Sequence, residues 1–218
     1  MTLRVVRSAE RLSETSRKIS MVIAGRAKVG KTSLLLTLPE AETLALDFEA
    51  GLAAVEGRWR GDSIPLRSWI DTVNVACLLG GPDPSKAPEE TFSQAHYDHV
   101  VGVASGIDAA RYKTIFVGGL DHHIDELSRE VFELQTEGAK TGTELPYIVD
   151  QIITMSDFDY DPATGAWSHN LGKGAHRAFC CRSPNPWGLP AGDRSGRLEL
   201  IEEPHLGRLI AKINQQKE

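Results

Sequence analysis

The sequence predicts an α/β fold with a mostly parallel sheet, because strand and helix signals alternate along most of its 218 residues. Apolar, β-branched runs such as 112–117 are followed by segments whose apolar residues recur at helical spacing. Beyond residue 156 the character changes to short strand pieces and turns rich in Pro, Gly and Ser. We therefore expect an α/β core with helices on both faces of the sheet, and a small β-rich appendage at the C-terminal end.

Three segments are expected within one domain. Residues 1–17 are mostly polar and charged, as in an N-terminal arm, residues 18–156 form the core, and residues 157–218 form a hairpin and helix extension. The expected core strands are 18–24, 43–47, 112–117 and 151–155. The expected helices are 32–38, 69–79, 93–107, 121–135 and 205–214.

Composition narrows the class of protein. Hydrophobic residues make up 41% of the chain and charged residues 25%, as in ordinary globular proteins. A net charge of −6 argues against a uniformly basic surface but allows a local basic groove. No apolar run approaches the roughly 18 residues of a membrane span, and the three cysteines form no C-x-x-C pair. We expect a cytoplasmic protein that does not contact a membrane.

The segment Gly25–Thr32 reads G-x-x-x-x-G-K-T and lies between a strand candidate and a helix candidate. In such a loop the glycines let backbone N–H groups surround a β-phosphate, while the lysine, here Lys31, reaches the β- and γ-phosphates. The hydroxyl of Thr32 is suited to bind Mg²⁺. The sequence therefore predicts a nucleoside triphosphate site, and the absence of an [NT]-K-x-D motif favours ATP. The expected nucleotide contacts are Gly25, Arg26, Ala27, Lys28, Val29, Gly30, Lys31, Thr32 and Ser33.

Two carboxylates follow the second expected strand, at the edge where open α/β sheets bind ligands. Glu49 is our candidate for the base that orients and deprotonates an attacking water. Asp47 is a candidate to support Mg²⁺ together with Thr32. The alternative is an acidic loop end that faces solvent.

A second metal-side carboxylate is expected at the end of strand 112–117, but Gly118 and Gly119 stand there instead. The next acid, Asp121, would lie on the order of 10 Å beyond the expected place if the chain stayed extended. Asp121 is therefore either a displaced metal ligand or a residue that caps the following helix.

Four histidines lack the spacing of a zinc site, namely His96, His99, His122 and His123. We expect all four to lie on solvated helix faces.

Two basic positions in the C-terminal part are candidates for macromolecular contacts. Lys173 and Arg177 lie in a glycine-containing segment that could contact a nucleic-acid backbone, or could be an exposed hairpin connection. Arg194 could reach the γ-phosphate of a neighbouring subunit as an arginine finger, or could simply pair with Asp193 in a turn.

Three segments, 21–33, 44–51 and 191–198, resemble the phage-type RecA-like ATPases. These P-loop proteins occur in phages and prophages and are linked to single-strand DNA recombination and annealing. The resemblance implies a RecA-like core, with ATP and Mg²⁺ as cofactors and Glu49 as the catalytic glutamate. It also implies single-stranded DNA as a partner and an active site that is often completed by a second subunit.

The chain departs from that family pattern in two places. Gly192 replaces the basic residue that leads the family's tail motif. Residues 112–120 read like the start of the family's Asp-bearing strand joined to the end of the next strand, as if one internal strand–helix unit were lost together with its Asp.

Three functions therefore stay open at this point. The chain is an ATP hydrolase acting in DNA recombination or replication, or a nucleotide-binding module deficient in hydrolysis. A small-molecule kinase is less favoured, because the loop 82–90 contains none of the arginines of a kinase lid.

Overall fold

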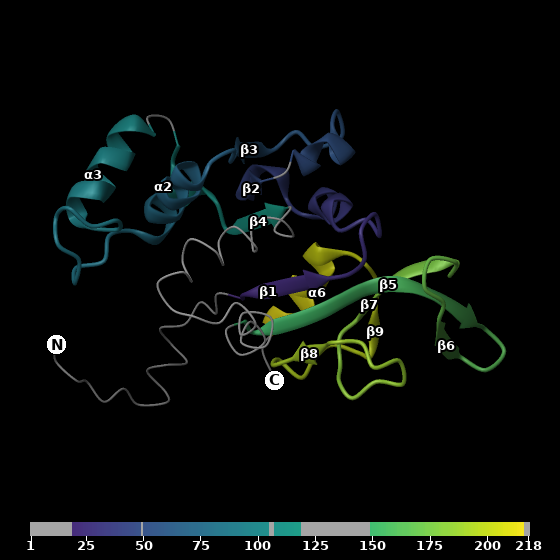
Figure 1. Cartoon of the computed structure of the whole chain (residues 1–218). Helices are drawn as coiled ribbons and strands as arrows, with labels where there is room; N and C mark the ends of the chain where they lie inside the picture. The colour runs from purple at the N-terminus through teal and green to yellow at the C-terminus, as the bar shows by residue number, and fades with distance from the viewer. Residues whose placement is uncertain (1–18, 49, 105–106, 119–148, 216–218) are drawn as a thin grey trace, which may run out of the picture. The chain divides into compact units, whose positions relative to one another are not determined.

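A computed structural model describes residues 19–48, 50–104, 107–118 and 149–215. The chain divides into two compact units, Met1–Lys31 with Ala139–Glu218 and Thr32–Gly138. Figure 1 shows the elements of both units, and each unit is described by itself below.

The first unit contains a six-stranded mixed sheet in the order β1-β5-β7-β9, with β6 and β8 also paired to β5. β1 is parallel to β5, whereas β6, β7 and β8 are antiparallel to β5 and β9 is antiparallel to β7. Its elements are β1 (Met21–Ala24), β5 (Gln151–Asp161), β6 (Ala166–His169), β7 (His176–Cys180), β8 (Gly192–Asp193), β9 (Ile201–Glu202) and α6 (Leu206–Asn214).

The long strand β5 organises this sheet. Its first eight positions are almost all buried, and its last residues extend into a hairpin with β6 (Figure 1). Phe158, at the junction, is fully buried and packs with the aromatic rings of Trp167 and Trp187. β5 thus connects the region beside β1 to the hairpin in one continuous piece of backbone.

The second unit contains a three-stranded parallel sheet in the order β3-β2-β4. Every residue of the central strand β2 is buried, and its leucines join the core cluster of Leu44, Leu46, Phe48, Leu66 and Val75. The elements of this unit are β2 (Thr43–Asp47), β3 (Asp62–Pro65), β4 (Thr114–Gly118), α2 (Trp69–Gly80), α3 (Gln94–Val103) and the 3₁₀ helices η1 (Thr32–Thr37), η2 (Glu40–Glu42), η3 (Gly51–Val55) and η4 (Ala109–Arg111).

The mixed α/β class is confirmed, with differences in detail. The helix expected at 32–38 is a 3₁₀ helix, and the one expected at 93–107 ends at Val103, with Ala104 as its C-cap residue. The strand expected at 151–155 continues to Asp161, since antiparallel pairing with β6 and β7 extends it. The helix expected at 121–135, with His122 and His123, lies outside the described residues.

His96 does not lie on a solvated helix face, contrary to our expectation. The His96 ring is partly buried, with Nδ1 accepting from the Phe92 amide at 2.9 Å and Nε2 lying 3.0 Å from the Asn74 Oδ1 atom of α2. His99 is exposed, as predicted. The ring of His96 therefore joins α3 to α2 as a structural hydrogen-bonding group.

The orientation of the strands also follows a pattern. The three pairings among β1 to β5 are all parallel, and the antiparallel ones are made by strands that follow β5 in the chain.

Among the described helices, none is long and apolar enough to cross a membrane.

The fold predicts that Leu44→Ala destabilises the protein strongly. Leu44 is 1% exposed in the core of the second unit, so the truncation should cost about 2–5 kcal/mol of unfolding free energy. Urea unfolding followed by circular dichroism measures this loss. The matched control Ile70→Ala removes a side chain that is 68% exposed and should change stability by about 0.5 kcal/mol or less. Equal losses in both variants would contradict this description of the core.

Candidate functional site

The segment Gly25–Lys31 leaves the carboxyl end of β1 and turns sharply against β5. A Cβ atom added to Gly25 would lie 2.5 Å from the carbonyl oxygen of Met155, so only glycine permits this close approach. Lys28 adopts a left-handed backbone conformation with a φ of 63°, and Val29 is fully buried beneath the loop. The loop is thus anchored to its neighbouring strand by backbone packing.

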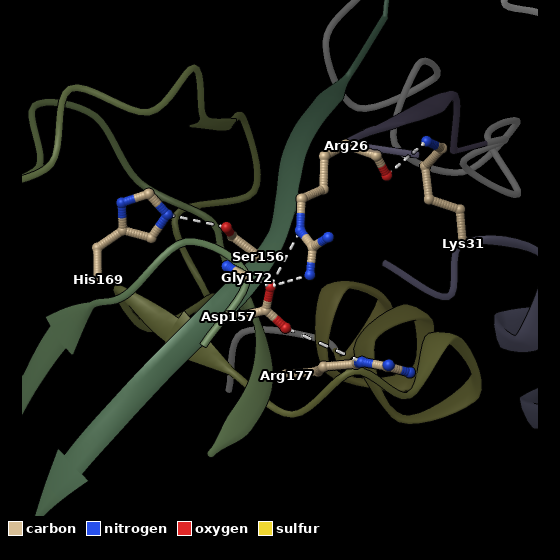
Figure 2. A network of polar contacts seen from close by, with 7 residues as sticks. All are labelled: Arg26, Lys31, Ser156, Asp157, His169, Gly172 and Arg177. Carbon is tan, nitrogen blue, oxygen red and sulfur yellow. Dashed lines mark hydrogen bonds and ion pairs between the residues drawn. The ribbon is translucent and has the colours of Figure 1, made fainter. Parts of the chain in front are cut away.

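The ammonium group of Lys31 lies against the start of this loop (Figure 2). Its Nζ atom donates to the carbonyl of Gly25 at 2.6 Å and to that of Arg26 at 3.3 Å. A positive charge therefore sits within the turn that the sequence predicts to hold phosphates.

A carboxylate of β5, Asp157, holds the loop from the side (Figure 2). Its Oδ2 atom accepts from Arg26 Nε at 3.1 Å, from Arg26 Nη2 at 2.7 Å and from the Gly172 amide at 3.1 Å. The Asp157 side chain is only 7% exposed, whereas that of Arg26 is 40% exposed. This charge-assisted pair ties the phosphate loop to β5 and to the turn at Gly172.

These contacts lower the pKa of Asp157 below its ordinary value. The hydrogen bond from Arg26 is the largest cause, and the Gly172 amide and the charges of Arg26 and Arg177 act in the same direction. Burial acts in the opposite direction but does not prevail. Asp157 was missed by sequence reasoning because the predicted strand ended at residue 155, whereas β5 continues to Asp161.

Arg177, which we predicted as a nucleic-acid contact, lies on β7 directly opposite Asp157. Its Nε atom is 4.0 Å from Asp157 Oδ1, and its Nη1 atom lies 3.1 Å from the position that a Cβ atom on Gly30 would take. Arg177 therefore approaches the phosphate loop. Lys173, the other predicted contact, is exposed in the turn between β6 and β7.

In the second unit, the two predicted metal ligands Thr32 and Asp47 lie near each other. Thr32 begins η1 and Asp47 ends β2, and a Cβ atom added to Gly51 would lie 3.8 Å from both Thr32 Oγ1 and Asp47 Oδ1. A hydroxyl and a carboxylate are oxygen ligands of the kind that Mg²⁺ prefers. This donor set fits Mg²⁺, with water completing the shell.

Asp47 also has protein partners. Its Oδ2 atom accepts from Arg67 Nη2 at 3.1 Å, and its Oδ1 atom accepts from the Leu52 amide at 3.4 Å. The carboxylate is thus held in place at the end of β2. Glu49, the predicted base, lies outside the described residues, as does Asp121, and the part of the chain that the structure covers holds no group of three metal-ligating His, Cys, Asp or Glu side chains.

Arg194 does not pair with Asp193, contrary to the simple turn that we considered. Its Nη1 atom donates to Asp150 Oδ1 at 2.9 Å, while Asp193 accepts from the Ser195 and Leu198 amides. Both carboxylate oxygens of Asp193 therefore accept hydrogen bonds within its own turn, and Arg194 pairs with Asp150 instead. Both arginine and partner line an open groove of about 510 Å³.

The contacts of Asp157 predict a pH-dependent stabilisation that Asp157→Asn removes. The carboxylate contributes fully above its unfolded pKa, near 4, and the contribution is lost as pH falls through the lowered folded pKa. At about pH 7 the variant should lose about 1–3 kcal/mol of unfolding free energy, and the loss should shrink near pH 3. Urea unfolding at both pH values measures this difference.

A matched control is Glu56→Gln, which neutralises an exposed carboxylate of the other unit. It should change stability little at either pH. A loss in Asp157→Asn that is the same at both pH values would show that the charge of Asp157 does not hold the loop.

Comparison with known proteins adds an independent observation. The AAA domain family matches residues 17–135, which is more than half of the chain and includes the phosphate loop, Thr32 and Asp47. Searches among curated proteins and among solved structures each returned no match. Members of the AAA ATPase family generally use ATP and Mg²⁺. The chain belongs to the AAA domain family of nucleotide-binding ATPases.

Proposed function

We propose that this chain is an ATP-binding P-loop protein of the phage-type RecA-like kind, which acts in DNA recombination or replication. The observation that carries the proposal is the glycine loop packed against β5, with Gly25 against the Met155 carbonyl and Lys31 folded over the turn. Membership of the AAA domain family supports the nucleotide, and the resemblance in the three sequence segments supports the pathway.

In this proposal, the residues 25–33 bind the phosphates. The backbone amides of the loop donate to the β-phosphate, and Lys31 leaves the Gly25 carbonyl to reach the β- and γ-phosphates. Thr32 and Asp47 would hold Mg²⁺, which neutralises charge on the phosphates when bound. Arg67 keeps the Asp47 carboxylate oriented by two contacts, one to its side chain and one to its backbone carbonyl.

Hydrolysis would depend on Glu49, which follows β2 two residues after Asp47 and would orient the attacking water. The alternative is a nucleotide-binding module deficient in hydrolysis. It is favoured by β4, which ends at Gly118 where a metal-side Asp is expected.

Single-stranded DNA is the proposed macromolecular partner, contacted by the turn that carries Lys173. Asp159 holds this turn at both ends, accepting from Asn170 Nδ2 at 2.6 Å and from the Ala175 amide at 2.9 Å. The turn therefore presents Lys173 to solvent on a defined backbone, as a phosphate contact requires.

A homo-oligomer would allow Arg194 to act as an arginine finger on a neighbouring subunit. The Arg194 side chain is 65% exposed, and its pair with Asp150 is a surface pair of the kind that contributes little stability. Arg194 could therefore exchange Asp150 for a phosphate of another subunit at small cost.

The test of this function is nucleotide binding and ATP turnover of three proteins. The parent should bind Mg²⁺–ATP, and Lys31→Ala should weaken binding by roughly tenfold or more, because a charge-assisted hydrogen bond to phosphate is lost. Glu49→Gln should bind ATP as the parent does but lower turnover by about 10²–10⁴-fold. Calorimetry and phosphate release measure the two properties.

Two outcomes decide between the proposal and its alternative. Binding by the parent with turnover no higher than that of Lys31→Ala would establish the hydrolysis-deficient module. No difference in ATP affinity between the parent and Lys31→Ala would contradict the nucleotide site itself.

The DNA contact has its own prediction. Lys173→Ala should weaken binding to a single-stranded oligonucleotide and reduce the slope of log affinity against log salt by about 1, because one phosphate contact is lost. Fluorescence anisotropy over a range of salt concentrations measures the slope. Lys86→Ala, an exposed lysine of the second unit, is the control. An unchanged slope in Lys173→Ala would exclude this turn as the DNA contact.

A further inference from the structure

We propose that Arg177 contacts the terminal phosphate of a nucleotide bound to the same chain, and so distinguishes a nucleoside triphosphate from a diphosphate. The proposal rests on the proposed function, in which the loop 25–33 binds a nucleoside triphosphate. It adds a phosphate contact from within the same chain to the one that Arg194 of a neighbouring subunit would make.

The register of the sheet brings Arg177 to the loop. β7 pairs with β5 so that Arg177 stands opposite Asp157, one strand away from the loop that β5 supports. From there Arg177 Nη1 reaches a point beside Gly30, at 3.1 Å from the notional Cβ position of that residue. Gly30, with a φ of 105°, belongs to the half of the loop that leads into Lys31. All of these residues belong to the first unit.

The two arginines beside Asp157 differ in how firmly they are held. Arg26 gives two hydrogen bonds to Asp157 Oδ2, an oxygen that the Gly172 amide also contacts. Arg177 faces the other oxygen at 4.0 Å, the outer limit of an ion pair, and its side chain is 56% exposed. Arg177 can therefore turn toward an anion at small cost, whereas Arg26 would have to break two hydrogen bonds to a carboxylate that is only 7% exposed.

The chemistry of the guanidinium group indicates which phosphate it would meet. The backbone amides of the loop and Lys31 surround the β-phosphate, which a diphosphate and a triphosphate share. Arg177 approaches the loop from β7, so it would meet the phosphate that lies beyond those amides, which is the γ-phosphate. The planar guanidinium fork matches two oxygens of that phosphate, a geometry that a lysine does not reproduce.

Asp157 would be the positioning residue of this arrangement. Its Oδ2 atom holds Arg26 and its Oδ1 atom faces Arg177 Nε at 4.0 Å, so a single buried carboxylate attracts both cations. Gly30 has a φ of 105°, a conformation that other residues rarely adopt, and a side chain there would begin 3.1 Å from Arg177 Nη1 and displace it.

The test compares the affinities of a non-hydrolysable ATP analogue and of ADP, each with Mg²⁺, by calorimetry. Arg177→Ala should weaken binding of the ATP analogue by about 10- to 100-fold, because a charge-assisted contact is lost. Binding of ADP should change by less than about threefold, since the β-phosphate contacts remain. Arg177→Lys should recover part of the loss, because charge returns without the fork.

The matched control is Arg208→Ala, which removes an arginine that is 69% exposed on α6 of the same unit. It should leave the ratio of the two affinities unchanged. Circular dichroism and the urea midpoint confirm that each variant is folded, as expected for an arginine that is 56% exposed.

The failures of the two proposals are distinguishable. Equal weakening of the ATP analogue and ADP in Arg177→Ala, or no weakening, would overturn the role of Arg177 while leaving the nucleotide site intact. A parent protein that binds neither nucleotide would overturn the proposed function and this inference together. A parent protein with equal affinity for both nucleotides would also overturn the inference.

Discussion

The buried carboxylate of Asp157 is the interaction on which the arrangement of the candidate site depends. It joins a loop near the start of the chain to a strand and a turn more than 130 residues further along, through Arg26 and the Gly172 amide. A carboxylate that is 7% exposed must be paired, so this contact leaves the first half of the loop little freedom to shift along β5. The close approach of Gly25 to Met155 adds a steric constraint at the same place.

The consequence is that the loop Gly25–Lys31, the predicted phosphate site, depends on a strand outside the family match. The AAA domain family covers residues 17–135, whereas β5, β7 and the turn between β6 and β7 follow that range. The match includes the residues expected to touch the phosphates and Mg²⁺, and the rest of the first unit holds the loop in place. Differences between this chain and its relatives in those later strands would therefore alter how the loop is held and which cations reach it.

Much of the fold could be predicted because β2, β4 and the first half of β5 are apolar runs, α2 ends at a Gly-Gly-Pro sequence and α3 begins after the N-cap Ser93. β3, which reads Asp-Ser-Ile-Pro, has no such run and was missed. Sequence alternation also does not reveal which strands pair, so the neighbours of β1 and β7 appeared only in the structure. For this reason Arg177 was assigned from the basic character of its segment alone, and Asp157 was not singled out.

The central claim, that residues 25–33 bind a nucleoside triphosphate, is tested most directly by hydrogen–deuterium exchange with and without Mg²⁺–ATP. Backbone amides that donate to phosphates are withdrawn from exchange, so the account predicts slower exchange in the peptide that spans Gly25–Ser33. It also predicts slower exchange in the β7 peptide that carries Arg177. Unchanged exchange in the Gly25–Ser33 peptide at a saturating ATP concentration would contradict the account.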